Sequence, residues 1–470
     1  MIDAINRPGH SQASEPVAVA QQQKQTGLWA FPGRKLVNYR MNEVVAQVGV
    51  QENIETSRPI IAEIKKSRVS RISRPKPMMN TFHGTALNHP IWQVPTPGLI
   101  LSPKRAVANY KAIQRAFPYA QVGYTVKSNP HPQLMKAISA VENAHMEVAS
   151  AAEVEWSINA GVPSDRIFYS NPVKQLSHIR AAVDKGVHLF AFDSEAEVDK
   201  MASISSNLSQ PLEVYVRMTV PHTGALWPLT HKFGVEPRKA VQLMQYARQR
   251  GLKPVGMAFH VGSQCNRAET WADALHAVAP AWQMAREAGI DLDVIDLGGG
   301  LPAPYFNPVI KPQDVADVVT PLLQTCTPGA KRVFLEPGRG VCATSADMVL
   351  EVIGLAERPD GQTWLYCDGG VFSGLYEIPD GIRPQVHPVI RETRPLGMRT
   401  YRLAGPTCDS MDTMFEVRSP VELKVGDRLV LKACGAYVYS VGSPFNGFPV
   451  AQTIEEGEWM LNLDEFVGIC

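Results

Sequence analysis

The sequence predicts an α/β plus β architecture: a (β/α)8 TIM barrel followed by an all-β C-terminal domain. Two observations lead to this expectation. Between about residues 98 and 340, short apolar or β-branched runs alternate with segments of helical periodicity, a pattern typical of parallel βαβ units. After about residue 346 the helical period disappears, and β-rich runs are separated by Pro and Gly turns.

The barrel is expected over residues 91–345, because eight strand-like runs match this fold in number and spacing. These runs are Gln121–Val126, Met146–Ala149, Ile167–Tyr169, Leu189–Phe192, Leu212–Arg217, Gly256–Val261, Val294–Leu297 and Val333–Leu335. The helical segments between them include Pro132–Val141, Ala152–Ala160, Leu176–Lys185 and Arg238–Arg250. Four of the helices are followed by a glycine that can end a helix in the left-handed conformation, namely Gly161, Gly186, Gly251 and Gly289.

The C-terminal β domain is expected over residues 346–470. Its predicted strands are Met348–Leu355, Trp364–Tyr366, Tyr401–Leu403, and a run from Asp427 through Lys432 to Tyr439. Residues 1–90 differ from both domains, with a glutamine-rich tract at Gln21–Gln25 and a basic run from Lys65 to Lys76. We expect a flexible extension that packs partly on the folded domains. A solvated extension and an arm for an anionic or oligomeric partner both fit its composition.

Composition excludes several classes of protein. The formal net charge of the 470 residues is +1, which gives no reason to expect nucleic acid or a membrane surface as partner. The 7 cysteines are scattered and lack any C-x-x-C spacing, so we expect neither a disulfide framework nor a metal site. We also expect no membrane span and no secretory signal, because no apolar run reaches about 18 residues and the first residues are polar. A reducing cytoplasmic location is therefore expected.

Polar and glycine residues follow several predicted barrel strands. Active sites of TIM barrels lie at the C-terminal ends of the strands, so these residues predict a site there. They are Lys127, Ser150, Glu153, His260, Ser263, Gly298, Gly299, Gly300, Glu336 and Arg339.

Four of these positions carry alternative interpretations. Burial would lower the pKa of Lys127 and favour the neutral amine that reacts with carbonyls, although a lysine at a strand end can simply extend into water. Backbone N–H groups at Gly298–Gly300 could hold a phosphate, or form a plain turn. Glu336 could pair with a cofactor's ring nitrogen, or with Arg339. His260 could stack on a planar cofactor, or be a core residue.

The C-terminal domain contains a second group of reactive residues. Cys408 and Asp409 adjoin in the motif GPTCDS, and a thiol beside carboxylates stays protonated, which suits a proton donor. Tyr437 and Phe445 belong to a glycine-aromatic cluster near the end of the chain.

Taken in order, the motifs YTVKSNP, EVASAAE, HVGSQ, DLGGG, EPGR, GPTCDS, GAY and FNGF resemble those of the fold-type III, pyridoxal-phosphate-dependent decarboxylases of basic amino acids. This family includes ornithine, lysine and diaminopimelate decarboxylases, and the resemblance covers residues from about 100 to 450. It implies an alanine-racemase-like barrel followed by a β-barrel or sandwich domain, and pyridoxal 5'-phosphate as cofactor.

The resemblance also implies roles for individual residues. Lys127 matches the lysine that holds the cofactor, His260 the histidine stacked on its ring, and Glu336 the partner of its ring nitrogen. Glu147 lies where animal ornithine decarboxylases carry a cofactor-side aspartate. The matches to phosphate-binding positions are Ser263, Gly299, Gly300, Arg339 and Tyr437.

The remaining roles concern the substrate. Cys408 matches the cysteine that protonates the α-carbon, Asp409 the acid that binds a distal amine, and Phe445 is expected to contact the substrate. In this family Cys408 and Asp409 would come from the other subunit, which implies a homodimer with shared active sites.

The expected reaction converts ornithine or lysine, in the L or D form, to putrescine or cadaverine and CO2. Gly369 stands where animal ornithine decarboxylases carry a second amine-binding aspartate, with Asp368 one position earlier, and this leaves lysine open as substrate. The alternatives are a diaminopimelate, carboxynorspermidine or carrier-bound amino-acid decarboxylase, and a non-enzymatic regulator on the same scaffold.

Overall fold

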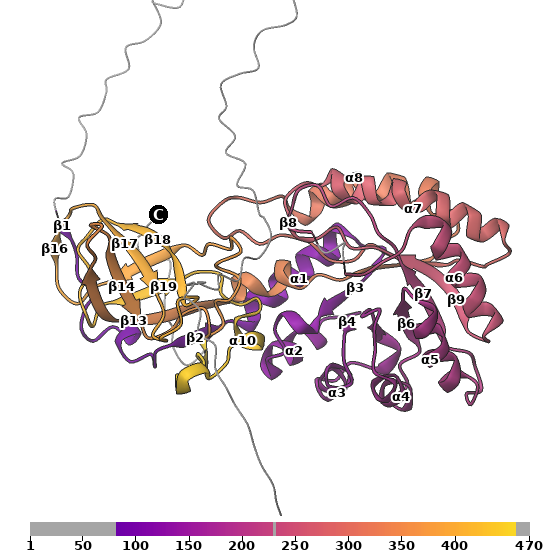
Figure 1. Cartoon of the computed structure of the whole chain (residues 1–470), viewed down its shortest axis with the longest axis horizontal. Coiled ribbons are helices and arrows are strands. Elements are labelled where there is room, and N and C mark those ends of the chain that lie inside the picture. Colours follow the sequence, from indigo (N-terminus) through magenta and orange to yellow (C-terminus); the bar gives the residue numbers. More distant parts are fainter. Residues whose placement is uncertain (1–80, 229–231, 457–470) are drawn as a thin grey trace, which may run out of the picture. The chain divides into compact units, whose positions relative to one another are not determined.

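The computed structural model describes residues 81–228 and 232–456, and Figure 1 shows their helices and strands. These residues belong to one compact unit that runs from Pro77 to Cys470. Residues 1–80, which make up most of the predicted N-terminal extension, lie outside the described residues. The flexibility and packing expected of that extension therefore remain predictions.

Eight parallel strands close into a barrel in the order β11-β12-β3-β4-β5-β6-β7-β9, and β11 also pairs with β9. The strands are β3 (Ala120–Thr125), β4 (His145–Val148), β5 (Ile167–Tyr169), β6 (Leu189–Phe192), β7 (Glu213–Arg217), β9 (Lys253–Ala258), β11 (Val294–Asp296) and β12 (Arg332–Leu335). Each one overlaps a run that the sequence predicts, so the barrel is confirmed.

Helices follow the barrel strands and cover them on the outside, as Figure 1 shows for α3 to α8. They are α1 (Pro103–Ala116), α2 (Pro132–Ser139), α3 (Ala151–Asn159), α4 (Leu176–Asp184), α5 (Glu195–Ser205), α6 (Pro237–Gln249), α7 (Glu269–Glu287), α8 (Pro312–Cys326) and the short α9 (Arg339–Cys342). The four glycines predicted to end helices all have positive φ angles, from 73° to 98°. A residue with a Cβ rarely adopts this backbone conformation, which explains the use of glycine.

The interior of the barrel changes character from one end to the other. Phe168, Val255, Val294 and Phe334 form a buried apolar cluster, in which the rings of Phe168 and Phe334 lie 4.7 Å apart. Side chains alternate along a strand, so the next inward positions toward the C-terminal ends are two residues later on each strand. After Val294 and Phe334 these positions are Asp296, the last residue of β11, and Glu336, directly after β12, so two acidic side chains follow the apolar cluster.

The C-terminal domain is built on a mixed sheet in the order β15-β19-β13-β14-β17-β18, with β2 also paired to β13 and β20 paired to β2. Its strands are β13 (Ala346–Glu357), β14 (Thr363–Cys367), β15 (Val386–Val389), β17 (Arg399–Ala404), β18 (Thr413–Ser419), β19 (Arg428–Leu431), β2 (Gly98–Leu101) and β20 (Gln452–Glu455). Two small antiparallel pairs complete the strands: β1 (Thr81–Phe82) with β16 (Arg394–Pro395), and β8 (Ala225–Trp227) with β10 (Ser263–Cys265).

Two segments differ from their expected structure. Strand β2 lies within the range assigned to the barrel, yet it pairs with β13 and β20 in the C-terminal sheet. The strand predicted to run from Asp427 to Tyr439 ends with β19 at Leu431. Ala433 and Tyr437 then have positive φ angles of 61° and 66°, which break the extended backbone, and helix α10 (Val438–Val441) follows.

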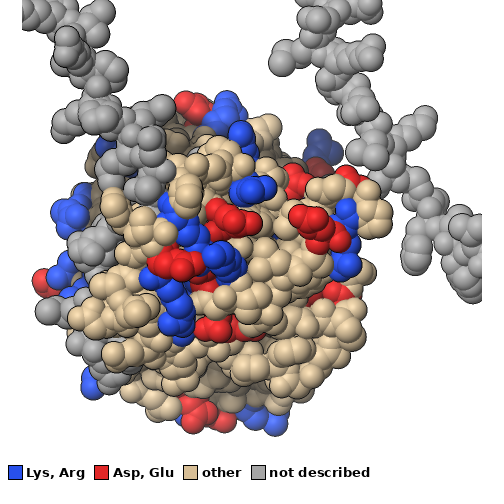
Figure 2. All heavy atoms as spheres, turned by 90° about the vertical axis from the view of Figure 1, so that its left-hand side faces the viewer, with Lys and Arg blue, Asp and Glu red and all other residues tan. Residues whose placement is uncertain are grey.

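Charges of both signs are interspersed on the end of the molecule shown in Figure 2. Between β17 and β18, Arg402 pairs with Glu416 at 3.3 Å. Among the described residues, every helix is too short or too polar for a membrane span. The same residues contain no cluster of three or more His, Cys, Asp or Glu side chains placed to hold a metal ion.

Candidate active site

A cavity of about 850 Å³ opens at the C-terminal ends of the barrel strands. Its lining contains eight of the residues that the sequence singles out: Lys127, Glu147, His260, Ser263, Gly300, Glu336, Arg339 and Tyr437. Seven of these residues follow or end barrel strands, and Tyr437 comes from the C-terminal domain. The two domains therefore build this cavity together.

Lys127 lies in a 3-10 turn, Val126–Ser128, that follows directly on β3. Its Nζ atom is 3.4 Å from Oε2 of Glu147, the residue before the last of the neighbouring strand β4. The Lys127 side chain is 50% exposed to the cavity, whereas the Glu147 side chain is only 2% exposed. A hydrogen bond of 2.7 Å, which Ser128 Oγ donates to the Thr125 carbonyl, stabilises this turn.

The charge state of Lys127 differs from the expectation. Burial does lower its pKa, but the negative groups around it, Glu147 first, outweigh burial and raise the pKa above the usual lysine value. Without a bound partner the amine is therefore protonated. Burial and the nearby Glu336 and Glu153 raise the pKa of Glu147 to about 7, although Lys127 opposes that rise.

Glu336 and His260 face the same cavity from β12 and β9. The backbone N–H of Glu336 donates to the Gly298 carbonyl at 2.9 Å, and Thr125 Oγ1 donates to the Glu336 carbonyl at 2.8 Å. Nδ1 of His260 accepts the N–H of Gly262 at 2.9 Å. Burial, with Arg217 and Lys127 as positive neighbours, holds the pKa of His260 well below its usual value, so the ring is neutral.

Glycines shape the floor of the cavity beside these residues. A Cβ atom on Gly299 would lie 2.6 Å from the Glu336 carbonyl oxygen and 2.9 Å from Nε2 of His260. Gly300 has a φ of 109°, and a Cβ there would lie 2.6 Å from the Gly262 carbonyl oxygen. A side chain at either position would fill the cradle. The backbone stays accessible to a planar, phosphate-bearing group such as pyridoxal phosphate, and the residues present fit that cofactor.

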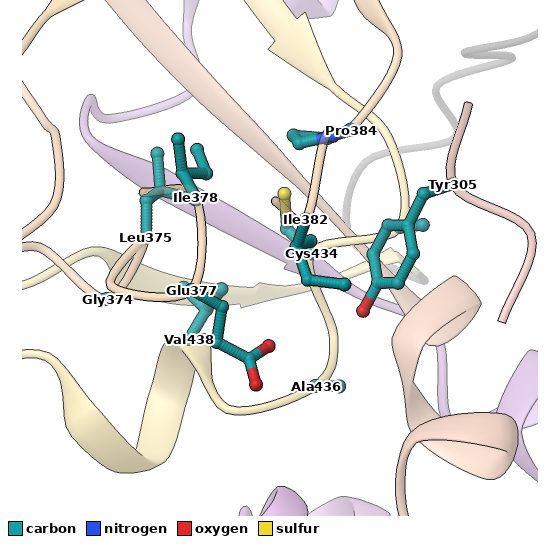
Figure 3. A pocket seen from close by; sticks show the side chains of 11 residues that line it. Tyr305, Gly374, Leu375, Glu377, Ile378, Ile382, Pro384, Cys434, Ala436 and Val438 are labelled. Carbon is teal, nitrogen blue, oxygen red and sulfur yellow. The ribbon is translucent and has the colours of Figure 1, made fainter. Parts of the chain in front are cut away.

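Arg339 is the cation at this end of the cavity, and its side chain is only 3% exposed. Its Nη1 and Nη2 atoms donate to the two carboxylate oxygens of Glu377 at 2.7 and 2.6 Å, and Nη1 also donates to the Tyr305 hydroxyl at 2.8 Å. Nε and Nη2 donate to Ser263 Oγ. In Figure 3 the Glu377 carboxylate and the Tyr305 hydroxyl point to the same side of a small apolar pocket. Glu377, Tyr305 and Ser263 together accept all five N–H groups of the guanidinium, so an anion at the Nε edge would share or replace the Ser263 contact.

The predicted substrate residues lie elsewhere. Cys408, Asp409 and Phe445 are absent from the lining of the Lys127 cavity. Cys408 is exposed, and its backbone N–H and its Sγ donate to Oδ1 of Asn446 at 3.2 and 3.3 Å. Oδ1 of Asp409 accepts the N–H of Met411 at 2.8 Å. The structure of one chain therefore brings eight of the predicted site residues together but leaves these three apart from them.

Asp368 and Gly369, which directly follow β14, lie at the position where the family resemblance would place a second amine-binding acid. Asp368 turns toward the sheet, where its Oδ1 accepts the Glu351 N–H at 2.8 Å. A Cβ on Gly369 would lie 2.8 Å from Leu350 Cδ2 and 2.9 Å from Pro97 Cβ, so this position faces packed side chains. Neither residue lines the cavity.

Sequence reasoning missed several residues at the site. Arg217 and Ser170 line the cavity from the ends of β7 and β5, but each is a single polar residue after a strand and carries no motif. Glu377 and Tyr305 pair with Arg339 across 38 and 34 residues of sequence, and no local pattern reports such a contact. Ser150 and Glu153 prove to cap helix α3, because Ser150 Oγ accepts the Glu153 N–H at 3.2 Å.

Comparisons with known proteins agree with this geometry. Residues 104–343 match the family model described as "Pyridoxal-dependent decarboxylase, pyridoxal binding domain". A lysine/ornithine decarboxylase from Selenomonas ruminantium is 32% identical over 380 residues, which cover 79% of this chain and 93% of that protein.

Solved structures give the same result. The crystal structure of a lysine/ornithine decarboxylase from Vibrio vulnificus, complexed with putrescine, superposes with a TM-score of 0.69 at 29% identity and covers 79% of this chain and 96% of the other. The crystal structure of SrLDC in complex with PLP and cadaverine superposes with a TM-score of 0.71 at 30% identity, covering 82% and 98%.

Proposed function

The chain belongs to the pyridoxal-dependent decarboxylase family of enzymes, and from this premise we propose that it removes the α-carboxyl group of ornithine or lysine. The products would be CO2 and the diamine putrescine or cadaverine, which places the enzyme in polyamine synthesis. The observation that carries the proposal is the convergence of Lys127, Glu336 and the Gly300–Arg339 cradle in one cavity.

Pyridoxal phosphate is the cofactor of this family, and when bound it accepts into its ring the electron pair that loss of CO2 leaves on the α-carbon. The residues of this chain would hold it in three places. Lys127 holds the reactive carbon of the cofactor, and Glu336 keeps a proton on the ring nitrogen. The ring of His260, which is neutral, would pack on one face.

The phosphate end is assigned to Ser263, Arg339, Tyr437 and the backbone of Gly299 and Gly300. Arg339 is held in place by Glu377 and by the rings of Trp227 and Tyr437, whose centroids lie 5.1 and 5.0 Å from its guanidinium carbon. A guanidinium fixed in this way brings its positive charge to the phosphate end without losing further side-chain freedom.

The substrate's distal amine is assigned to the carboxylate of Asp409, and the proton delivered to the α-carbon is assigned to Sγ of Cys408. We place both residues, with Phe445, in the active site of a second subunit, because none of them lines the Lys127 cavity of its own chain. The functional unit would then be a homodimer with two shared active sites, and we propose a cytoplasmic location for it.

The experiment that tests this function is CO2 release from L- and D-ornithine, L- and D-lysine, arginine and meso-diaminopimelate. We expect turnover of ornithine or lysine, since Asp409 can pair with an amine at the far end of either. Turnover of diaminopimelate alone would contradict the role of Asp409, because that substrate ends in a carboxylate. No CO2 from any substrate would instead favour a regulatory protein.

A cofactor-binding control belongs with this panel. Lys127→Ala is expected to abolish CO2 release and the visible absorbance of the bound cofactor, because no amine remains to hold it. Lys104→Ala, at the start of α1 and away from the cavity lining, is the matched control and should change neither. Full absorbance in the Lys127→Ala protein would remove Lys127 from its assigned role.

A further inference from the structure

A second buried carboxyl group, Asp296, lies behind Glu336. Asp296 is the last residue of β11 and pairs in register with Phe334 on the parallel strand β12. Glu336 follows Phe334 by two residues, so both side chains project from the same face of the sheet. Asp296 is 1% exposed and Glu336 is 6% exposed. Only Glu336 reaches the cavity lining.

Only one of the two carboxyl oxygens of Asp296 has a hydrogen-bond partner among the described residues. Its Oδ1 atom accepts the Gly298 N–H at 2.8 Å, whereas its Oδ2 atom is buried and has no hydrogen-bond partner among the described residues. The neighbour of Asp296 that can hydrogen-bond to this carboxyl group is the Glu336 side chain. Two ionised carboxylates have no hydrogen to share, so the contact becomes a hydrogen bond only if one of them is protonated.

The surroundings decide which of the two groups carries the proton. Burial raises the pKa of Asp296 well above its usual value, and the nearby Glu336 side chain raises it further. The Gly298 N–H and the positive charge of Arg217 act in the opposite direction without cancelling these effects. Tyr215, the other titratable group that faces Asp296, remains protonated because burial raises its pKa as well. The proton therefore belongs on Asp296.

We propose that Asp296 is a positioning residue that stays protonated at neutral pH and donates its Oδ2 hydrogen to Glu336. The donated hydrogen bond orients the Glu336 carboxylate, the group assigned to the cofactor's ring nitrogen. This inference rests on the proposed function for the role of Glu336, but the protonation of Asp296 is a property of the chain without cofactor.

The first test uses the apo-protein and two variants. Asp296→Asn is nearly isosteric and permanently neutral, because its Oδ1 can accept the Gly298 N–H and its Nδ2 can donate to Glu336. Asp293→Asn is the matched control. Asp293 directly precedes β11, but its carboxylate pairs with Arg332 at 2.9 Å and is partly exposed. The melting temperature of each apo-protein is measured from pH 4 to pH 9.

A folded-state pKa above the unfolded value of about 4 means that wild-type stability is lost as the pH rises through the folded pKa. Asp296→Asn lacks this loss, so its melting temperature relative to wild type should increase steadily from pH 4 to pH 9. Asp293→Asn should show no such increase, because it removes an ion pair. An Asp296→Asn protein that becomes progressively less stable than wild type at high pH would show that Asp296 is ionised and would overturn the proposal.

The second test is the affinity for pyridoxal phosphate, measured by titration of cofactor absorbance. We expect Asp296→Asn to bind within about threefold of wild type, and Asp296→Ala, which has no donor, to bind at least about tenfold more weakly. Equal losses in both variants would overturn the positioning role. Wild-type protein that binds no cofactor would overturn the proposed function instead, while the melting curves would still report on the proton. If Asp296→Ala fails to fold, the positioning role is tested by the affinity of Asp296→Asn for pyridoxal phosphate relative to that of wild type.

Discussion

Lys127 shows how the acidic side chains of the barrel mouth set the chemistry of a single residue. Burial alone would favour a neutral amine, yet Glu147, Tyr437, Glu336 and Glu153 together keep it charged before the cofactor arrives. The charged form is well suited to attract a phosphate ester, whereas bond formation with an aldehyde needs the neutral amine. Glu147 is therefore expected to control the pH at which the lysine becomes reactive.

Glu147→Gln tests this control. Glu147 raises the pKa of Lys127 more than any other group does. Removal of its charge should therefore lower that pKa and increase the neutral fraction of Lys127 at any given pH. We expect the rate at which apo-protein incorporates pyridoxal phosphate to rise several-fold at pH 8, with the whole pH profile displaced to lower pH. Stopped-flow absorbance across the pH range measures both quantities.

Glu155→Gln provides the control for that experiment. Glu155 lies on α3 near the same strand end, but its side chain is exposed, and its loss should leave the profile unchanged. A Glu147→Gln profile that coincides with wild type, or that moves to higher pH, would show that Glu147 does not hold the Lys127 charge.

At the scale of elements, the barrel could be predicted because each of its strands falls in a short apolar or β-branched run between helices. Parallel strands buried on both faces read as continuous apolar runs, and this signal is local. Strand β2 has the same signal in Gly98–Leu101, but its partners β13 and β20 are separated from it by hundreds of residues. Its assignment to the second sheet depends on which distant strands it pairs with, and the local sequence pattern does not encode this.

The sequence predicts a strand that runs on to Tyr439, whereas the strand ends at Leu431, and the reason for this difference is not the same as for β2. The segment after β19 must leave the sheet and reach the barrel, where Asn129 Nδ2 donates to the Gly435 carbonyl at 2.8 Å and the Tyr437 N–H donates to the Ser128 carbonyl at 2.7 Å. The positive φ angles at Ala433 and Tyr437 serve this crossing. These residues are not typical of that conformation, so composition predicted an extended strand instead.

Gly435→Ala tests whether this crossing segment positions Tyr437. A Cβ on Gly435 would lie 1.9 Å from the Cys342 carbonyl oxygen, so the segment would have to move. We expect a loss of about 1–3 kcal/mol in the free energy of unfolding and weaker binding of pyridoxal phosphate, since Tyr437 and Arg339 would shift together. Denaturant unfolding and cofactor titration give the two values.

The control for the crossing segment is Gly397→Ala, where nothing lies within 4 Å of an added Cβ and φ is ordinary. It should leave stability and cofactor affinity close to wild type. If Gly435→Ala destabilised the protein without changing cofactor affinity, the segment would be structural only.

At the scale of the whole molecule, the near-zero net charge of +1 fits a small cationic substrate, because local carboxylates suffice to bind it. The cofactor half of the site could be predicted from sequence, since Lys127, His260, Gly300 and Glu336 all stand at strand ends that a barrel brings together. Asp296 and Glu377 could not be assigned in the same way, because their roles arise from contacts with Glu336 and Arg339 that only the folded chain shows.

Cys408 and Asp409 raise a question that one chain does not answer, because the cavity around Lys127 lacks both. If a second subunit supplies them, two defective chains can complement each other. Lys127→Ala destroys one half of the site, and Cys408→Ala is expected to keep cofactor binding but to impair correct protonation of the product. Each homodimer should then form little diamine.

An equimolar mixture of the two variants, dissociated and reassembled, should recover about a quarter of wild-type diamine formation, since half of the dimers would be mixed and each would hold one intact site of two. The matched control is a mixture of Lys127→Ala with His260→Ala. Both of these residues line the same cavity of one chain, so no mixed dimer has an intact site and recovery should be absent. Recovery in neither mixture would place Cys408 beside Lys127 of its own chain, or outside the reaction altogether.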